Sequence, residues 1–263
     1  MMKKIALLAC IAASSSQAGP ADGVAEVSIL PGWTTNAGTH MAAIRISLLP
    51  GWKTYWRAPG DAGIPPHIDF SASQNVAAAQ FHWPTPSVFD DAGMRSIGYT
   101  DGVTVPIELT PQSDGAITLA GTMIIGVCEE ICVPVQLSFD AMLPRGGARD
   151  SAIVASLIDR PYTSDEAGVT DVVCSISPME NGLTVTATLT MPPAGGHEVV
   201  VMEANDPMVW VSESDVTRRG DQITATSDMI HANADAFALD RSALRFTVFG
   251  ADRVVDVQGC TAG

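Results

Sequence analysis

Two cysteines four positions apart, Cys128 and Cys132, are the residues of this 263-residue chain whose type and spacing most directly indicate chemistry. In an extended strand such positions lie about 13 Å apart, at roughly 3.3 Å per residue. A disulfide requires Cα atoms roughly 4.4–6.8 Å apart. The flanking sequence has the alternation of β-structure, and Pro134 disfavours a helix past Cys132. The chain is therefore predicted to fold back within residues 129–131, as a hairpin tip that two sulfurs can close or leave open.

A disulfide at this tip would stabilise the fold only a little. In the chain-entropy model a five-residue loop gains about 2 kcal/mol, against about 4.6 kcal/mol for a loop of about 87 residues. Sulfurs at an accessible turn are better placed for thiol–disulfide exchange than for holding a fold together. A purely structural hairpin disulfide is the alternative, and the spacing alone leaves it open.

The N-terminus has the composition of a secretory signal. Two lysines precede an apolar run from Ile5 to Ala13, and small residues near Ala18 complete the pattern, which predicts a signal peptide over residues 1–18. Cys10 would leave with it; a lipoprotein anchored at Cys10 is a less favoured alternative, because only five apolar residues precede it. No later run reaches the 18 apolar residues of a membrane span, so we expect a soluble periplasmic protein without membrane insertion.

The charge balance excludes two classes of partner. The formal net charge is -15, and removing the two lysines of the signal takes it to -17. Such a chain repels nucleic acid and anionic membrane surfaces. We expect neither as a partner, and we expect a monomer.

Four cysteines remain after the signal, and they allow three pairings. The most economical pairing joins Cys128 to Cys132 and Cys174 to Cys260, because each bond then stays inside one predicted domain. The long loop between Cys174 and Cys260 is where a structural disulfide would help most. Two separate thiols at Cys174 and Cys260 are the alternative.

Short alternating segments separated by Gly, Pro, Asn and Asp predict an all-β protein built from two β-sandwiches. A Gly-rich, charged break at 143–150 separates a first domain, residues 19–143, from a second, residues 150–263. A short helix is predicted at Ser151 to Asp159, near the start of the second domain. Strands are predicted at 41–49, 103–109, 117–125, 133–142, 169–176, 183–191, 198–203, 222–227 and 244–249, with a hairpin turn at Asn181-Gly182.

A group of motifs upstream of the cysteines is more specific than these patterns. It resembles the N-terminal periplasmic domain of the thiol:disulfide interchange protein DsbD, in particular the ScsB-type branch of that family. The resemblance covers about residues 25–142. The motifs are Leu49-Pro-Gly-Trp52-Lys-Thr-Tyr55-Trp56-Arg57-Ala-Pro59-Gly60-Asp61-Ala-Gly63-Ile-Pro65-Pro66, then Trp83-Pro84-Thr-Pro86, Ile97-Gly98-Tyr99, Val105-Pro106 and the cysteine hairpin.

This resemblance implies an immunoglobulin-like sandwich with a redox-active pair at Cys128 and Cys132. Family members receive electrons by thiol exchange from a membrane-embedded or thioredoxin-like donor and pass them to periplasmic thioredoxin-fold proteins. The ScsB-type branch also has a second immunoglobulin-like domain, which agrees with the β-pattern of residues 150–263. The expected activity is that of a protein-disulfide reductase or thiol–disulfide oxidoreductase relay, without a cofactor.

The chain departs from the family pattern in two respects. Full-length members continue into a transmembrane electron conduit and a thioredoxin-like domain, whereas this sequence ends at Gly263. The expected electron donor is therefore a separate membrane protein. The cysteine spacing is also shorter than in the best-known DsbD domains, although it suits the ScsB-like branch.

The resemblance and the local sequence name further residues for the site. Glu129 and Glu130 lie between the sulfurs, and their charge should disfavour a thiolate; simple solvation of the turn is the alternative. Family members shield the pair with an aromatic cap loop, which corresponds here to residues 87–94, with Phe89 and Asp90 as cap candidates. Aromatic residues that line the site or pack in the core are Trp52, Tyr55, Trp56 and Tyr99.

Two other functions compete with the relay. Thiols and thioethers select Cu(I), and ScsB-type systems are linked to copper stress, so a Cu(I)-binding protein is one alternative. The sequence has no Met-x-x-Met or His-rich tract, however, and we predict no metal site. The second alternative is a non-catalytic interaction module with two structural disulfides. Hydrolase motifs such as Gly-x-Ser-x-Gly and His-Glu-x-x-His are absent from the sequence.

Overall fold

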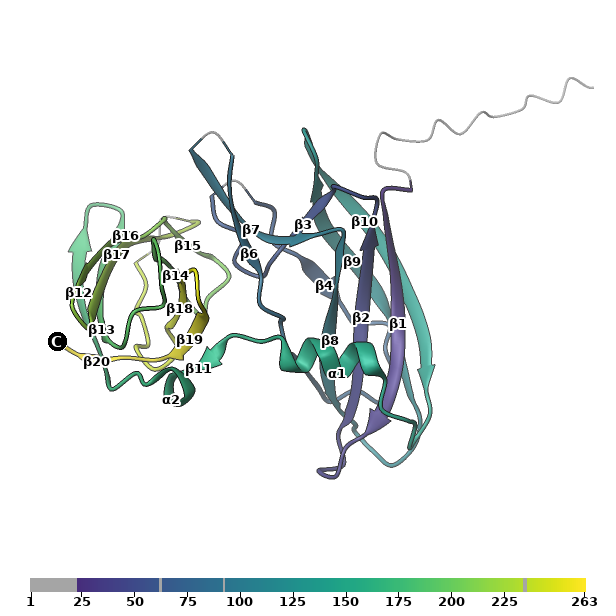
Figure 1. Ribbon diagram of the computed structural model, residues 1–263. Helices are drawn as coiled ribbons and strands as arrows, with labels where there is room; N and C mark the ends of the chain where they lie inside the picture. Colours follow the sequence, from purple (N-terminus) through teal and green to yellow (C-terminus); the bar gives the residue numbers. More distant parts are fainter. Residues whose placement is uncertain (1–22, 62, 92, 234–235) are drawn as a thin grey trace, which may run out of the picture.

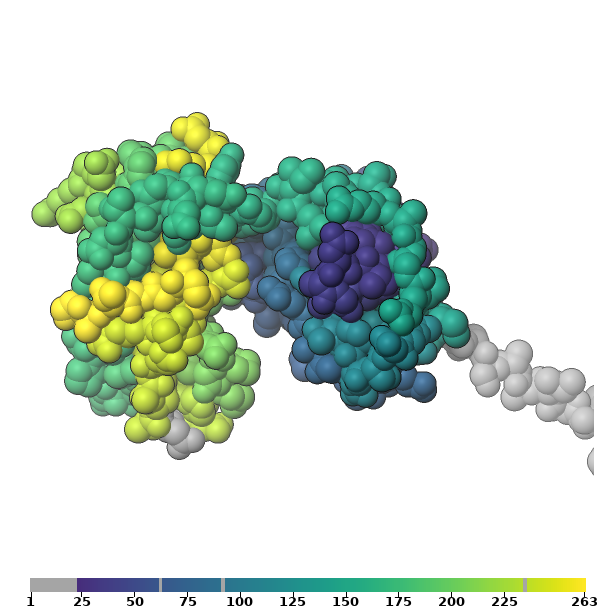
Figure 2. Space-filling view, turned by 90° about the horizontal axis from the view of Figure 1, so that it is seen from below, coloured from purple at the N-terminus to yellow at the C-terminus, as the bar shows by residue number. Residues whose placement is uncertain are grey.

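The computed structural model describes residues 23–61, 63–91, 93–233 and 236–263. The predicted signal peptide over residues 1–18, with Cys10, lies outside this part. Two β-sandwiches follow one another along the chain (Figure 1). Seen from below, they form two lobes in contact (Figure 2). The predicted fold class, all-β with two immunoglobulin-like sandwiches, is confirmed.

The first sandwich has a four-stranded sheet in the order β1-β2-β8-β5 and a six-stranded sheet in the order β10-β9-β3-β7-β6, with β4 paired to β9. Every pair in both sheets is antiparallel. The strands are β1 (Ala25–Thr34), β2 (His40–Leu48), β3 (Lys53–Tyr55), β4 (His67–Asp69), β5 (Ala78–Phe81), β6 (Ser87–Asp91), β7 (Met94–Thr100), β8 (Gly102–Thr110), β9 (Ile117–Cys128) and β10 (Cys132–Leu143).

The second sandwich has a four-stranded sheet in the order β11-β19-β18-β14 and a six-stranded sheet in the order β15-β17-β13-β12-β20, with β16 paired to β17. Its strands are β11 (Tyr162–Thr163), β12 (Asp171–Met179), β13 (Gly182–Thr190), β14 (Val199–Glu203), β15 (Val209–Val211), β16 (Asp215–Arg219), β17 (Gln222–His231), β18 (Arg245–Phe249), β19 (Val254–Gln258) and β20 (Thr261–Ala262).

Strict alternation explains why β13 was predicted, whereas β1, a strand of similar length, was not. Along β13 every second side chain, Val185, Ala187 and Leu189, is fully buried in the second core. The intervening threonines face outward and pair across the sheet with threonines of β17, at 3.1 Å for Thr186–Thr226 and 3.2 Å for Thr188–Thr224. A fully buried valine or leucine side chain contributes about 1.5–3 kcal/mol.

The predicted hairpin between β12 and β13 is present, with its turn shifted by one residue. Met179 pairs with Gly182, so Glu180 and Asn181 form the two-residue loop and Gly182 begins β13. A side chain at Gly182 would collide with the backbone carbonyl of Met229. The glycine therefore serves close strand packing rather than the turn itself.

The predicted helix is α1 (Ser151–Ile158), and its N-cap is Asp150, whose carboxylate accepts hydrogen bonds from the backbone N–H groups of Ala152 and Ile153. Ile153 is fully buried against Met41 and Ala43 of β2. The helix thus packs on the first sandwich, beside β8 (Figure 1).

The second sandwich begins with β11, which is followed by a short helix, α2 (Ser164–Ala167). This helix was not predicted, and a capping box between Thr163 and Glu166 supports it. Among the described residues, no helix has the length and apolar character needed to cross a membrane.

A disulfide joins Cys174 of β12 to Cys260, just before β20, with a Cα–Cα distance of 5.8 Å. Cys174 is fully buried in the second core, and Cys260 packs against the same core. The bond closes a separation of 86 residues along the chain, and it ties the C-terminal segment to β12. A cross-link over so long a loop removes much of the entropy of the unfolded chain.

Replacing both Cys174 and Cys260 by alanine is expected to lower the free energy of unfolding by about 2–4 kcal/mol, because a long loop is released in the unfolded state. Urea unfolding followed by circular dichroism measures this change. The matched control is Cys128→Ala/Cys132→Ala, which opens a short loop and should cost less. An equal or smaller loss for the Cys174/Cys260 variant would contradict a structural role for that bond.

Candidate functional site

The cysteine hairpin forms as its spacing predicted. Cys128 ends β9, Cys132 begins β10, and the two residues are direct cross-strand partners. They are joined by a disulfide with a Cα–Cα distance of 4.1 Å. The chain reverses within residues 129–131. The register of β9 and β10 therefore holds the two sulfurs together before any other contact is considered.

The two cysteine residues differ in their exposure to solvent. Cys132 is exposed, whereas Cys128 is half-buried at the end of β9. The residues of the turn are exposed too: Glu129 and Glu130, and Ile131 with 74% of its surface accessible. An incoming thiol can therefore approach the Cys132 side of the disulfide without prior opening of the sandwich.

A buried tyrosine contacts the exposed cysteine. The Tyr55 hydroxyl donates a hydrogen bond to Cys132 Sγ over 3.0 Å, although only 5% of the Tyr55 surface is accessible. Strand β3 lies beside β9 with Lys53 opposite Cys128. Because side chains alternate along a strand, Lys53, Tyr55 and Cys128 share the sheet face opposite the core-facing Val127.

Gly126 makes this contact possible. A Cβ atom on Gly126 would lie 2.7 Å from ring atoms of Tyr55 and 2.7 Å from Cβ of Ile64. The tyrosine ring thus occupies the space that a side chain at Gly126 would fill, and it crosses β9 toward β10. A side chain at Gly98, on the opposite flank of β3, would collide with the Thr54 carbonyl. Two glycines therefore let β3 and its tyrosine pack closely between β7 and β9.

A tight turn sets the start of β3. The Trp52 amide donates to the Leu49 carbonyl at 3.1 Å, and Gly51 has a φ of 85°. This is the geometry of a type II turn with Pro50 and Gly51 in its central positions. The Asp101 carboxylate fixes the turn by accepting the Gly51 amide at 2.7 Å. The Leu49–Trp52 motif thus has a structural purpose, which is to place β3 in register with Cys128.

Charged residues of both signs surround the pair. Lys53 is the cross-strand neighbour of Cys128. Glu129 and Glu130 lie in the turn between the two cysteines, where their negative charge disfavours a thiolate. The Lys53 amine also lies 4.5 Å from the centre of the Phe89 ring, a cation–π contact that links the β6–β7 hairpin to the site.

Other residues named from the sequence have different surroundings. Trp52 packs against the first core. Tyr99 is buried, which raises the pKa of its hydroxyl, and this hydroxyl donates to the Pro84 carbonyl at 2.8 Å. The Asp90 carboxylate accepts the Gly93 amide at 3.2 Å and so closes the β6–β7 turn. Trp56 lies between the two sandwiches.

Lys53, Ile64 and Gly126 were not predicted as parts of the site. Lys53 and Ile64 lie within the Leu49–Pro66 motif and Gly126 lies two residues before Cys128, but no local signal distinguishes them. Their importance comes from pairing between strands distant in sequence. Among the described residues, no group of three or more His, Cys, Asp or Glu side chains is arranged to hold a metal ion.

The chain is similar to known proteins in sequence and in fold. Residues 24–144 match the family described as "Thiol:disulfide interchange protein DsbD, N-terminal". The fold is similar to the crystal structure of the N-terminal periplasmic domain of ScsB from Proteus mirabilis, with 25% sequence identity and a TM-score of 0.68. The match covers 94% of this chain and 97% of that chain, so it includes both sandwiches. No curated protein matches this chain.

Replacing Tyr55 by phenylalanine should raise the pKa of the Cys132 thiol, because the hydroxyl would no longer donate to the thiolate. Hydrogen bonds to charged groups contribute about 1.5–3 kcal/mol, and solvent at Cys132 reduces this, so we expect about threefold to tenfold slower alkylation at neutral pH. The measurement is the pH profile of iodoacetamide alkylation of reduced Cys128→Ala protein, with and without Tyr55→Phe.

The matched control is Tyr99→Phe in the same background, which removes a tyrosine hydroxyl that donates to a carbonyl instead of a sulfur. It should leave the alkylation profile of Cys132 unchanged. Equal profiles for the Tyr55→Phe protein and its parent would show that the hydroxyl does not stabilise the thiolate.

Proposed function

Because residues 24–144 belong to the DsbD N-terminal family, we propose that this chain is a periplasmic thiol–disulfide exchange protein whose Cys128–Cys132 pair cycles between disulfide and dithiol. The observation that carries the proposal is the exposed disulfide at a hairpin tip, with a buried tyrosine hydroxyl on its more exposed sulfur. A bond that closes so short a loop adds little to stability. Its position suits attack by a second protein.

In the proposed reaction, Cys132 forms the mixed disulfide and Cys128 resolves it. In the dithiol state the Cys132 thiolate attacks one sulfur of a client disulfide, and the other client sulfur leaves as a thiolate. The Cys128 thiolate then attacks Cys132 Sγ, which closes the hairpin disulfide and releases the second client sulfur. Two electrons pass to the client, whose two thiolates take up the protons that Cys128 and Cys132 have lost.

The surroundings of each sulfur support this assignment. Cys132 is exposed and receives the Tyr55 hydrogen bond, which stabilises a thiolate on the attacking sulfur. Cys128 is half-buried and lies opposite Lys53. When a donor thiolate attacks Cys132 to recharge the pair, Cys128 is the leaving group.

The proposed partners are proteins of two kinds. The donor is a membrane electron conduit or a thioredoxin-like domain that carries a dithiol. The clients are periplasmic thioredoxin-fold proteins, which present an exposed cysteine that can meet Cys132. This assignment rests on the family match and on the similarity to a domain described as periplasmic.

Single-cysteine variants test the exchange and the assignment together. Reduced Cys128→Ala protein should displace thionitrobenzoate from a thioredoxin that carries it on its nucleophilic cysteine and lacks its resolving cysteine. It should then stay in a stable mixed disulfide, because no second thiol resolves it. Cys132→Ala protein should react more slowly, since Cys128 is half-buried. Release of the coloured thionitrobenzoate gives the rate, and a non-reducing gel shows the adduct.

The outcomes separate three possibilities. Faster capture by the Cys128→Ala variant supports the proposal. Faster capture by the Cys132→Ala variant would reverse the roles of the two sulfurs. No adduct from either variant would overturn exchange and favour the non-catalytic interaction module.

Phe89 is proposed as a cap over the site. Its ring covers the Lys53 amine, and Lys53 is the cross-strand neighbour of Cys128. Phe89→Ala should therefore speed oxidation of the reduced pair by glutathione disulfide several-fold, because the shield and the ring contact are both lost. The matched control is Val88→Ala, whose side chain packs against the Trp56 cluster instead. Equal rates for the two variants would remove the cap role from Phe89.

A further inference from the structure

The two residues that follow Tyr55 are held by the second sandwich. Trp56 is fully buried, and its ring packs edge-to-face on Phe249 of β18, with ring centres 5.8 Å apart and planes at 90°. Val199 of β14 belongs to the same cluster. The first and second sandwiches thus share a small apolar core directly beside the tyrosine that contacts Cys132.

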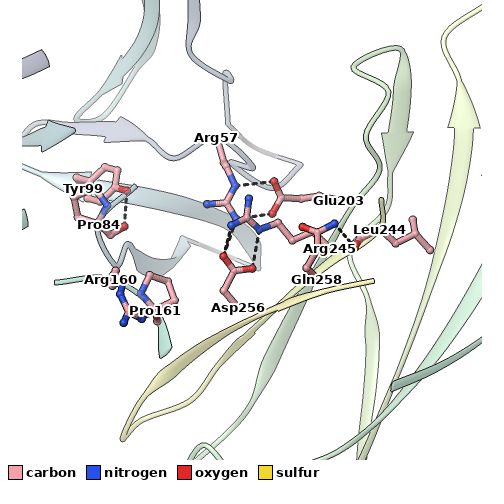
Figure 3. Close-up of polar contacts among 10 residues, drawn as sticks. All are labelled: Arg57, Pro84, Tyr99, Arg160, Pro161, Glu203, Leu244, Arg245, Asp256 and Gln258. Carbon is pink, nitrogen blue, oxygen red and sulfur yellow. Dashed lines mark hydrogen bonds and ion pairs between the residues drawn. The ribbon is translucent and has the colours of Figure 1, made fainter. Parts of the chain in front are cut away.

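Arg57 adds an ion pair to this contact. Its Nε and Nη2 groups each donate to one carboxylate oxygen of Glu203 at 2.9 Å, and its guanidinium lies 3.9 Å from the centre of the Trp56 ring. The Asp256 carboxylate lies 4.0 Å from Arg57 Nη2 and also pairs with Arg245. Figure 3 shows Arg57 reaching from the first sandwich to these carboxylates of the second. The pair is mostly buried, with 16% of the Arg57 side chain and 19% of the Glu203 side chain accessible.

Arg57 and Glu203 have a geometry that resists displacement. A bidentate arginine–carboxylate pair constrains orientation as well as distance. The cation–π contact with the Trp56 ring further restricts the position of the guanidinium. Glu203 is itself fixed, because it lies in β14 with Arg245 of β18 as its cross-strand partner. The backbone at Trp56 and Arg57 is therefore anchored to the sheet of the second sandwich.

The loop that follows Arg57 packs against Tyr55. The backbone of Ile97 accepts the Trp56 amide and donates to the Pro59 carbonyl, both at 2.9 Å, so the loop is tied to β7. A Cβ atom on Gly63 would lie 3.0 Å from the Tyr55 ring. Ile64 and the Tyr55 ring both pack over Gly126. The loop thus covers Tyr55 and keeps it buried.

Beside this contact the interface is hollowed. A groove of about 650 Å³ separates the loop from the second sandwich, and Pro59, Pro65, Met208 and Trp210 are among its lining residues. Across it, a more exposed ion pair joins Arg95 to Glu213 at 3.1 Å. The groove interrupts the packing beside Trp56 and Arg57, so these two residues make the contact between the sandwiches that lies nearest to Tyr55 along the chain.

We propose that the second sandwich positions Tyr55 against Cys132 through Trp56 and Arg57, with Glu203 and Phe249 as positioning residues for the redox pair. The physical reason is proximity along the chain, since one peptide bond separates Tyr55 from Trp56. Hydrogen bonds weaken steeply as distance and angle depart from ideal. A small shift of the anchor therefore weakens the contact between the Tyr55 hydroxyl and Cys132 Sγ. The biological meaning of this inference rests on the proposed function.

The test is a double-mutant cycle between Glu203→Gln and Tyr55→Phe, in the Cys128→Ala background. The readout is the pH profile of iodoacetamide alkylation of Cys132. Lys53, Glu129 and Glu130, the charged groups nearest the pair along β3 and the turn, are the same in every variant. Glu203→Gln alone should slow alkylation at neutral pH by about twofold or more, in the same direction as Tyr55→Phe, because the Tyr55 hydrogen bond is weakened. In the Tyr55→Phe protein, Glu203→Gln should cause no further slowing of Cys132 alkylation.

The matched control is Glu198→Gln, which alters a bidentate pair with Arg218 that lies wholly inside the second sandwich. It should leave the profile unchanged. Phe249→Leu provides a second route to the same result, because it removes the ring contact with Trp56 and keeps an apolar side chain there. Circular dichroism spectra and thermal unfolding show which variants are folded.

Two results would overturn the inference. One is an unchanged profile in folded Glu203→Gln and Phe249→Leu proteins. The other is an effect of Glu203→Gln that persists in full without the Tyr55 hydroxyl, since the coupling would then bypass the tyrosine. Neither result depends on a protein partner. Failure of exchange with thioredoxin would therefore refute the proposed function and leave this alkylation measurement intact. An unchanged alkylation profile would refute the positioning role of the second sandwich and leave the proposed function intact.

Discussion

The packing of the Tyr55 ring over Gly126 is the constraint on which the candidate site depends. The ring needs a position on β9 without a side chain, and it needs β3 to enter the sheet with Lys53 opposite Cys128. The turn at Pro50 and Gly51 supplies that register, and the Asp101 carboxylate holds the turn. From this arrangement follow the burial of Tyr55 and the direction of its hydroxyl toward Cys132.

The hairpin that carries the pair lies in a sheet of the first sandwich, and the Tyr55 hydroxyl donates to Cys132 Sγ there. Two glutamates lie in the turn between the cysteines. A pair in these surroundings suits the proposed exchange, in which a docked partner excludes water and so strengthens the electrostatic interactions at the sulfurs.

The two disulfides show how the same bond has different consequences in different places. Cys174 and Cys260 lie in the core of the second sandwich and close a separation of 86 residues, whereas the hairpin bond closes a separation of 4 at the surface. The second sandwich also reaches the first through Trp56 and Arg57, next to the hairpin's tyrosine. A domain without a recognisable motif of its own is thus joined to the site by two neighbouring residues.

The sequence by itself determined the features that depend on local pattern. Alternation predicted the long strands such as β13 and β17, the cysteine spacing predicted the hairpin, and the motif from Leu49 to Pro66 indicated the family. The short strands β3 and β4 were beyond such pattern analysis, because three residues carry no periodicity. Tertiary structure decided that Tyr55 meets Cys132 while Tyr99 meets Pro84, and that Lys53 lies beside Cys128. These outcomes depend on which strands become neighbours, and pairing between distant segments is a property of the whole sheet rather than of any segment in it.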